Sequence, residues 1–510
     1  MTRTHRSLWS LIAGYGSSGV AMVIGLVSTP ILLDYLGDAR VGLYRIALGW
    51  LGYTALFELG LATTLQVLLS KAHGTGDRAA TVQILRRGNR AYVLVAMASA
   101  LLTAIFIAIA PYLSRDIPPE LVVELRWGFA LSLIGLMLLP LTPFRSLAES
   151  QQRSYFIHLA GTVQQIVVFV LSVGFAILAF GIVGQFAAAL VGSIVAILIL
   201  TRDGMRRFPE IIGRDTSKKA GKAIPMTSGA MLTYHLAARI CTTADTIIIG
   251  LMLGAEAALI YTVSMRLSQI ALAQVLAVGN ATWAALADLH HRGEVERFNE
   301  RLVELTRIVG WLGCAVLVPV TVWNSDFVSA WVGETRYAGA ALNWLMLAAS
   351  YALSITALWG WPLMATGRVR AVLPYFLTGG ILNLAISIIV TYTNGLIGPA
   401  VGAAVNLVGV VGWWCPLVLR REFGTPLRPL FSAVVLPVLL ALPFGGLLIF
   451  VQDRWPITEL PWPRAMKFVA LAGCMGGAAM IYLVVGWRCL FTPDTRTSLS
   501  ARIFPNRGAK

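Results

Sequence analysis

Apolar residues dominate the chain in long runs that short polar stretches interrupt. A membrane-spanning helix needs about 20 consecutive, mostly apolar residues. Fourteen runs meet this requirement, at approximately 9–33, 41–69, 90–113, 125–147, 155–179, 182–201, 223–252, 257–287, 305–324, 340–364, 371–391, 396–419, 429–451 and 467–487. The pattern therefore predicts an all-α polytopic membrane protein with about 14 transmembrane helices.

The composition supports the same class. Of the 510 residues, 57% are hydrophobic and only 13% are charged, whereas a soluble domain is roughly a quarter charged. This excludes an ordinary soluble enzyme, a disordered chain and a secreted disulfide scaffold. The five cysteines are far apart and form no CxxC pair, so we expect buried thiols, no metal site and no cofactor.

The net charge of +16 is unevenly distributed along the chain. Thirty of the 40 Lys and Arg residues lie in the segments that share one side of the membrane with both termini, and seven lie on the other side. Because basic residues favour the cytoplasmic side, we expect both termini in the cytoplasm. The richest loop is 202–222, but the chain has no folded basic domain with interleaved aromatic residues, so we expect no nucleic-acid partner.

The chain contains an internal repeat. The segment 35–49 resembles 252–266, so that Gly37 corresponds to Gly254. Further along, 181–194 resembles 395–408 at nearly the same offset. Spans 1–6 and 7–12 are therefore predicted to be two copies of one unit.

The repeat predicts the domain organisation. Because each copy has an even number of spans, the two copies have the same orientation in the membrane. We expect two parallel six-helix bundles around a central cleft, 1–215 and 216–425, followed by two additional C-terminal helices and a cytoplasmic tail, 426–510. Such an arrangement is typical of transporters that work by alternating access.

The first two spans resemble a known family. The segment 29–65 is similar to the start of the polysaccharide-exporter flippases, the Wzx-type (O-antigen and exopolysaccharide) branch of the multidrug/oligosaccharidyl-lipid/polysaccharide (MOP) superfamily. The matching features are a late proline, a Leu-Gly step, a Gly-aromatic pair and an acidic-Leu-Gly-Leu end, here Pro30, Leu36-Gly37, Gly42 with Tyr44, and Glu58 to Leu61. Leu43 separates the Gly-aromatic pair, which departs from the family pattern.

The resemblance implies a flippase of the bacterial inner (cytoplasmic) membrane. Its cargo would be an isoprenoid-diphosphate-linked oligosaccharide, moved from the cytoplasmic to the periplasmic leaflet. The partners implied are this lipid-linked oligosaccharide, membrane lipids, and a glycan polymerase or other export machinery. The extra C-terminal pair is similar to that of fourteen-span exporters, where such helices can line a lipid groove.

Ionisable residues at membrane depth are candidates for function, because burying them is costly. Three arginines and a histidine are expected to bind the diphosphate or glycan in the cleft: Arg45, Arg239, Arg266 and His235. Guanidinium groups suit this role because they match phosphate oxygens in pairs. Two carboxylates, Glu58 and Asp245, are candidates for proton or sodium coupling.

Each of these residues has a structural alternative. The two carboxylates can neutralise arginines of neighbouring helices, Arg45 and Arg266 can extend to the interface, and His235 can be a hydrogen-bonded core residue. Nearer the cytoplasm, Arg145 and Arg153 could receive the diphosphate or simply anchor the helix ends. Tryptophans such as Trp50 and Trp359 could stack on sugars or belong to the core or interface.

Two other functions remain open at this point. A cation-coupled multidrug exporter of the same superfamily would favour an acidic cleft, which the intramembrane arginines oppose. A membrane glycan polymerase or ligase would need a long external loop for its catalytic carboxylates, and the external loops here are short. We therefore expect a transporter without catalytic residues.

Overall fold

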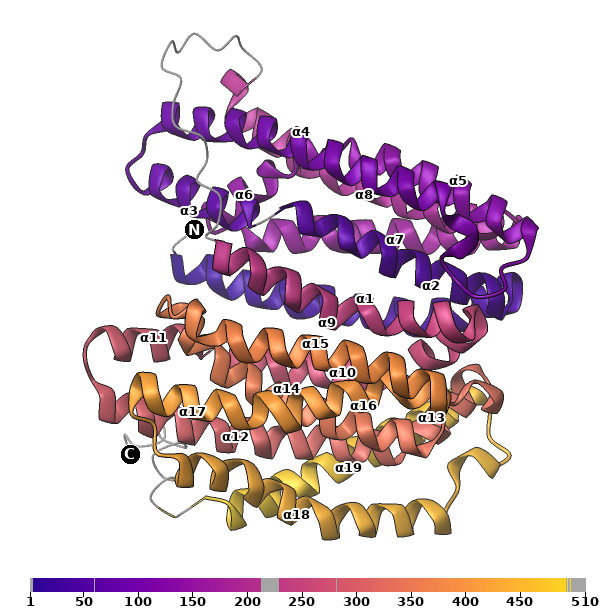
Figure 1. Cartoon of the computed structure of the whole chain (residues 1–510), viewed down its shortest axis with the longest axis vertical. Coiled ribbons are helices and arrows are strands. Elements are labelled where there is room, and N and C mark those ends of the chain that lie inside the picture. Colours follow the sequence, from indigo (N-terminus) through magenta and orange to yellow (C-terminus); the bar gives the residue numbers. More distant parts are fainter. Residues whose placement is uncertain are drawn as a thin grey trace. The chain divides into compact units, whose positions relative to one another are not determined.

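The computed structural model describes residues 3–58, 60–211, 229–280, 282–491, 493 and 496. Within these residues every regular element is a helix, as the sequence predicts (Figure 1). The chain forms two compact units, Met1–Leu259 and Ile260–Lys510.

The first unit holds the helices up to the start of α10. They are α1 (Arg3–Leu36), α2 (Asp38–Gly52), the 3₁₀ turn η1 (Tyr53–Glu58), α3 (Leu61–Gly74), α4 (Arg78–Ala108), η2 (Ala110–Tyr112), α5 (Pro119–Leu136), η3 (Leu139–Leu141), α6 (Pro143–Ser150), α7 (Ser154–Ile177), α8 (Gly181–Arg207), η4 (Pro209–Ile211) and α9 (Gly229–Leu253). Helix α10 (Ala255–Asn280) begins in the first unit and continues into the second.

The second unit contains the remaining helices. They are α11 (Trp283–His291), α12 (Val295–Val322), α13 (Asn324–Val332), η5 (Glu334–Arg336), α14 (Ala340–Ala365), α15 (Val369–Asn394), η6 (Gly395–Ile397), α16 (Gly398–Ala404), the π-helical η7 (Val405–Val411), α17 (Gly412–Phe423), α18 (Leu427–Arg454), η8 (Ile457–Glu459) and α19 (Arg464–Cys489). The last pair, α18 and α19, packs on α12.

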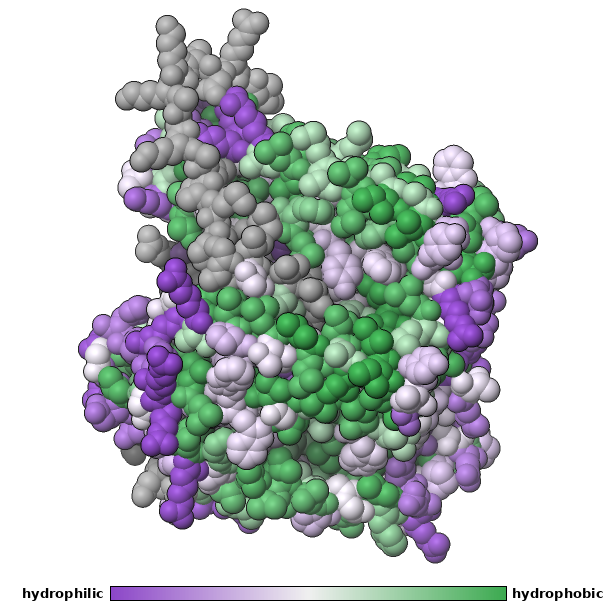
Figure 2. All heavy atoms as spheres, viewed as in Figure 1, coloured by the Kyte–Doolittle hydropathy of each residue, from purple (hydrophilic) through white to green (hydrophobic). Residues whose placement is uncertain are grey.

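Eleven stretches of the described residues are long and apolar enough to cross a membrane, or 12 if the bent pair Asp38–Glu58 and Leu61–Gly74 counts as one span. The sequence predicts fourteen. Two predicted spans, 371–391 and 396–419, lie in the single stretch Val369–Phe423, and 223–252 lies partly outside the described residues. Figure 2 shows hydrophobic residues over the middle of the helices and hydrophilic residues at their ends.

The repeat is visible in the backbone. Helices α2 and α10 begin at corresponding positions of the two copies, each preceded by a glycine with positive φ, at 77° for Gly37 and 95° for Gly254. Helices α4 and α12 also begin at corresponding positions, after Gly76 and Gly293. Only glycine adopts these conformations readily, so the repeated glycines mark where corresponding helices begin.

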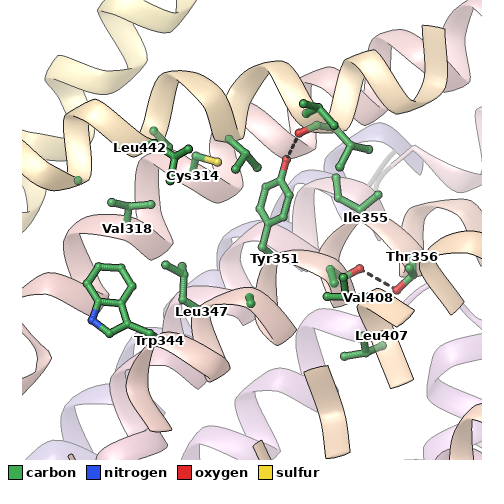
Figure 3. Close-up of a pocket in the computed structure, with 18 of the residues that line it drawn as sticks. Cys314, Val318, Trp344, Leu347, Tyr351, Ile355, Thr356, Leu407, Val408 and Leu442 are labelled. Atoms are coloured by element: carbon green, nitrogen blue, oxygen red, sulfur yellow. Dashed lines mark hydrogen bonds between the residues drawn. The ribbon is translucent and has the colours of Figure 1, made fainter. Parts of the chain in front are cut away.

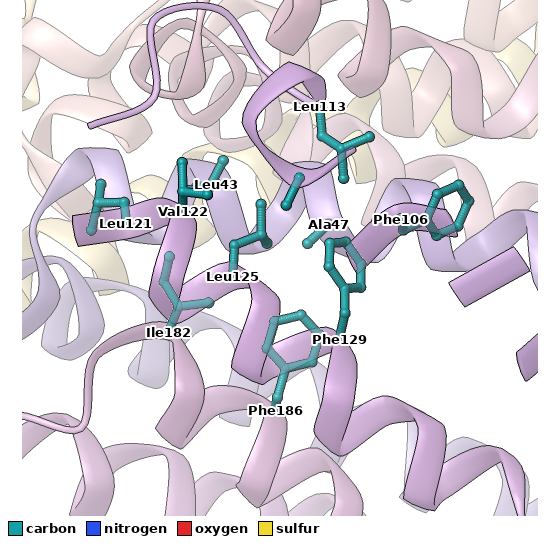
Figure 4. Packing of buried hydrophobic residues seen from close by; sticks show 11 residues of the cluster. Leu43, Ala47, Phe106, Leu113, Leu121, Val122, Leu125, Phe129, Ile182 and Phe186 are labelled. Carbon is teal, nitrogen blue, oxygen red and sulfur yellow. The ribbon is translucent and has the colours of Figure 1, made fainter. Parts of the chain in front are cut away.

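The core of the first unit is an apolar cluster at one end of its helices (Figure 4). Leu43 of α2, Phe129 of α5 and Phe186 of α8 are almost completely buried there. A bidentate ion pair closes the same region: Arg40 of α2 donates to Glu124 of α5, with Nη2 2.8 Å from Oε1. Glu124 also accepts the backbone N–H of Ile182 at 2.8 Å, which fixes the start of α8.

Candidate functional site

Helices α2 and α9 lie against each other through small residues. A Cβ on Gly250 would lie 2.5 Å from Ile46, and one on Gly49 would lie 3.1 Å from Ile247. These pairs show that the two helices run antiparallel in close contact, as glycine-lined helix pairs in membranes do. Helix α2 presents Arg45 and helix α9 carries Asp245, so two predicted site residues belong to one helix pair.

The register of this pair sets the levels of the two charges. Ile46 faces Gly250 and Gly49 faces Ile247, so Arg45 lies near the C-terminal end of α9, while Asp245 lies roughly 10 Å further along the seam at 1.5 Å per residue. Both side chains are partly exposed. Within the described residues, Arg45 makes no hydrogen bond or ion pair, which leaves its guanidinium available to a ligand.

The other cleft candidates are placed less completely. His235 and Arg239 fall on α9, but their side chains lie outside the described residues. Arg266 lies on α10 in the second unit and is partly exposed.

Glu58 lies at the point where the second span breaks. The chain is a 3₁₀ helix from Tyr53 to Glu58, and Gly60 has a left-handed conformation with φ of 75° before α3 begins. The hydroxyl of Tyr92 on α4 donates a hydrogen bond to the Glu58 carboxylate. Tyr92 has an exposed fraction of 0%, so this carboxylate has a fully buried partner that the sequence did not reveal.

Arg145 belongs to the same cluster. Its Nε lies 3.2 Å from Oε1 of Glu149, one turn further along α6, and the charges of both residues act on the Tyr92 hydroxyl. The structure thus brings together Glu58, a predicted coupling residue, and Arg145, a predicted cytoplasmic contact. The Arg145 side chain is 60% exposed, so it remains accessible.

Arg153 has a different setting. It is only 8% exposed and forms a bidentate ion pair with Asp203 of α8. Asp203 also accepts from Arg207 at 3.1 Å, and the Arg153 guanidinium lies 5.0 Å from the centre of the Phe156 ring. Since a buried pair is costly to separate, this environment suits an anchor between α7 and α8 better than a transient ligand.

The tryptophans considered for sugar stacking are mostly core residues. Trp359 is 2% exposed, and its Nε1 donates to Thr306 at 3.0 Å. Trp50 donates to the carbonyl of Leu113 at 3.3 Å and packs on Phe106. Within the described residues, no group of three or more His, Cys, Asp and Glu side chains could hold a metal ion.

The second unit contains a cavity that sequence reasoning missed (Figure 3). It has a volume of about 670 Å³ and lies between α12, α14, the η7–α17 segment and α18. Its lining is almost wholly apolar, and Trp413 and Leu442 are 63% and 65% exposed, so it is open on one side. Apolar residues that line such a cavity cannot be distinguished in a sequence from residues that face lipid.

Two hydroxyl groups of the cavity wall are hydrogen-bonded within the protein. The Tyr351 hydroxyl donates to the carbonyl of Val434 at 2.8 Å, and the Thr356 hydroxyl donates to its own helix (Figure 3). Tyr482 of α19 donates in the same way to the carbonyl of Pro437 at 2.6 Å. The two tyrosines hold α18 near Pro437, and the cavity lining contains few hydrogen-bonding groups.

Comparison with known proteins adds the family. The family described as "Polysaccharide biosynthesis protein" matches residues 9–284, just over half of the chain. No curated protein matches the chain.

Several solved structures share the fold. The lipid II flippase MurJ, in an inward closed conformation, matches with a TM-score of 0.66 at 11% identity, over 95% of this chain and 99% of that chain. An inward-facing multidrug resistance MATE family transporter of the MOP superfamily matches with a TM-score of 0.58 at 17% identity, over 83% and 100% of the two chains. A MOP superfamily transporter from Pyrococcus furiosus, described as having a binding pocket of reverse polarity, matches with a TM-score of 0.54 at 12% identity, over 81% and 95%.

Proposed function

Because this chain belongs to the polysaccharide biosynthesis protein family, we propose that it flips an isoprenoid-diphosphate-linked oligosaccharide from the cytoplasmic to the periplasmic leaflet. It is a multi-pass membrane protein with the fold of MOP-superfamily transporters, and it belongs with transporters rather than enzymes. A hydrated sugar and a diphosphate cannot cross about 30 Å of hydrocarbon unaided, which is why such a cargo needs a protein.

The observation that carries the proposal is the apolar cavity on α18. A polyisoprenoid tail needs an apolar surface and no hydrogen-bonding partner, and a large apolar pocket open on one side offers this surface. About 670 Å³ of apolar space accommodates part of such a tail. The extra helix pair then serves the lipid, as the resemblance to fourteen-span exporters implies.

The basic residues supply the other end of the cargo. We assign the diphosphate and the first sugars to Arg45, Arg239, Arg266 and His235, in a cleft between the bundles 1–215 and 216–425, with 426–510 as the lipid-binding appendix. The accessible Arg145 is the better candidate for receiving the diphosphate from the cytoplasm, because Arg153 is occupied by Asp203. Transport would follow alternating access.

The proposal also covers the ion that drives transport and the membrane in which the protein lies. Glu58 and Asp245 are the carboxylates that we assign to proton or sodium coupling. We place the protein in a bacterial inner membrane with both termini in the cytoplasm, because the basic residues gather on that side. A glycan polymerase or other export machinery would receive the flipped cargo.

A multidrug exporter is the second candidate, since the fold is also that of a MATE transporter. That match covers 83% of the chain, whereas the MurJ match covers 95%. A preference of the purified protein for organic cations over a lipid diphosphate would favour this second candidate.

A substitution that fills the cavity with a bulky side chain tests the proposal. Gly446 lines the cavity, and a Cβ there would have nothing within 4 Å. In cells that lack the native protein, Gly446→Phe should lower glycan export about tenfold or more, because the ring would occupy space that the tail needs and overfilling a packed apolar site costs about 1–3 kcal/mol. The lipid-linked oligosaccharide should then accumulate in the cytoplasmic leaflet.

Gly473→Phe is the matched control, because Gly473 is an exposed glycine of α19 that also has nothing within 4 Å and does not line the cavity. It should export normally. Equal export by the two variants would remove the cavity from the transport cycle. Independently, Arg239→Ala should abolish export while the protein still inserts, and full export by that variant would remove Arg239 from the site.

A further inference from the structure

Helix α4 holds the broken part of the second span at two points. Ser99 donates to the carbonyl of Thr54 at 3.3 Å, and Tyr92 donates to the carboxylate of Glu58. Ser99 and Tyr92 are separated by two helical turns, so they lie on one face of α4. Both side chains have an exposed fraction of 0%. One buried face of α4 therefore forms hydrogen bonds with η1 near both of its ends.

Segment η1 has the properties of a hinge. The stretch Asp38–Glu58, which the segment ends, and the following helix Leu61–Gly74 are bent by 45° relative to each other. A 3₁₀ stretch in the middle of a span often marks such a hinge, and the left-handed Gly60 lets the chain turn. Glu58 is the last residue of the 3₁₀ segment, so its carboxylate lies at the hinge itself.

The second copy of the repeat shows that the fold does not require this polar pair. At the offset that relates Gly37 to Gly254, Glu58 corresponds to Val275 and Tyr92 to Val309, and these valines are 2% and 1% exposed. Helix α10 passes through Val275 unbroken as far as Asn280. The helix with the buried valine is unbroken, whereas the polar pair accompanies the bend.

The helices around Glu58 and Tyr92 carry several charged residues. Segment η1 packs on α2, α4 and α9. Arg145 and Glu149 of α6 act on the Tyr92 hydroxyl. Helix α2 carries Arg45, and α9 carries Asp245 together with His235 and Arg239, whose side chains lie outside the described residues.

We propose that Tyr92 is a positioning residue that latches Glu58 across the break in the second span, and that the latch loosens when Glu58 takes up a proton. The inference deepens the coupling role given to Glu58 above and rests on it. A hydrogen bond to a charged carboxylate is roughly twice as strong as one between neutral groups. A proton from water that binds the carboxylate therefore weakens the Tyr92–Glu58 hydrogen bond by about half and leaves the Ser99–Thr54 bond unchanged.

The first experiment measures the bend directly in the full chain, reconstituted in lipid. Spin labels on Leu48→Cys of α2 and Val67→Cys of α3, both exposed positions, report the distance across the break when the native cysteines are replaced by alanine. Tyr92→Phe and Glu58→Gln should each broaden the distance distribution at neutral pH, and the double variant should be no broader than Tyr92→Phe alone. The labelled wild-type background should broaden in the same way in acid.

Tyr53→Phe is the matched control, because Tyr53 lies on η1 and its hydroxyl makes no hydrogen bond within the described residues. It should behave as the wild type does. A Tyr92→Phe distribution identical to that of Tyr53→Phe at neutral and acid pH would overturn the latch. If Tyr92→Phe fails to fold, Glu58→Gln carries the same comparison.

Transport gives a second readout. Tyr92→Phe should slow export about tenfold, the effect of losing a hydrogen bond to a charged group, yet it should have a much smaller effect in a Glu58→Gln background, where only a neutral hydrogen bond is lost. Additive losses would assign Tyr92 to packing alone. The distance measurement needs no cargo, so an error in the proposed cargo would leave the latch result standing, and a failed latch would leave the cavity test untouched.

Discussion

The two copies of the repeat place different chemistry at corresponding positions. In the first, Glu58 and Tyr92 form a hydrogen bond beside a broken helix, while Val275 and Val309 occupy these places in the second beside an unbroken one. The second copy instead borders the apolar cavity on α18. The same helical repeat therefore carries a polar pair at a bend in one copy and borders a large apolar cavity in the other. Residues that differ between the copies in this way are not required by the shared fold, so they are candidates for function.

Among the positions that differ between the two copies, we expect the largest effect of substitution at Gly42. A Cβ there would lie 1.9 Å from the carbonyl oxygen of Ala255, whereas the second copy has a buried leucine, Leu259, at this position. Because a backbone carbonyl must shift, Gly42→Ala should destabilise the protein by about 3 kcal/mol or more. Thermal unfolding in detergent measures this.

Gly74→Ala is the control for that measurement, since nothing lies within 4 Å of a Cβ at Gly74. It should be neutral or slightly stabilising. Equal melting temperatures for the two variants would mean that α2 does not approach α10 as closely as described.

A second difference concerns Glu124, which accepts from Arg40 and from the N–H of Ile182. The second copy has alanines, Ala257 and Ala341, in place of the ion pair. Glu124→Gln should cost about 1–3 kcal/mol, because it weakens hydrogen bonds to a charged acceptor. Denaturant unfolding checks this, with the exposed Glu120→Gln of the same helix expected to have no measurable effect.

At a third position the polar residue belongs to the second copy and the apolar residue to the first. Asp326 of the second unit accepts from Gln452 at 2.6 Å and from Thr458 at 3.2 Å, and so ties α13 to the end of α18. The first copy has Ile109 at this position, whose side chain cannot accept a hydrogen bond. Asp326→Ala should cost about 1–2 kcal/mol.

Amide hydrogen exchange measures the effect of Asp326→Ala. Exchange of the backbone amides of α18 should accelerate in this variant, while exchange in α4 stays unchanged. Asp453→Ala is the control, since Asp453 is exposed and has no partner within the described residues. Acceleration by Asp453→Ala as large as that by Asp326→Ala would contradict the tie.

The smallest effect is expected at the ion pair of Arg78 with Glu210, whose atoms lie 2.9 Å apart. The hydrogen bond from Arg78 lowers the pKa of Glu210. A lowered pKa contributes stability at neutral pH that is lost as the pH falls through the folded-state value. Glu210→Gln should therefore be slightly less stable than wild type at neutral pH and equal to it in strong acid, and a difference that persists in acid would exclude this pair as its source.

The sequence predicted the elements of the fold well, because the signals are local. Long apolar runs mark helices, and the repeated Gly37 and Gly254 both proved to have positive φ before corresponding helices. Glu58 was recognised as unusual because a carboxylate at membrane depth is rare.

The partners of the candidate residues could not be predicted in the same way. Tyr92 is one aromatic residue among many in an apolar run, and only the packing of α4 on η1 reveals that its hydroxyl reaches Glu58. Arg153 and Asp203 are far apart along the chain, and nothing in either segment indicates their pairing. The cavity on α18 depends on how four helices leave space between them, which no single helix encodes.

The apolar wall on α18 has a consequence for how selectivity evolves. Because its lining is almost wholly apolar, the cavity distinguishes ligands mainly by their bulk, and one methylene group more or less changes affinity by only about 1–3 kcal/mol. Such a surface tolerates many hydrocarbon chains and leaves the identity of the sugar to be decided elsewhere. A lineage could thus acquire a new glycan through substitutions in its polar residues while inheriting this half of the molecule unchanged.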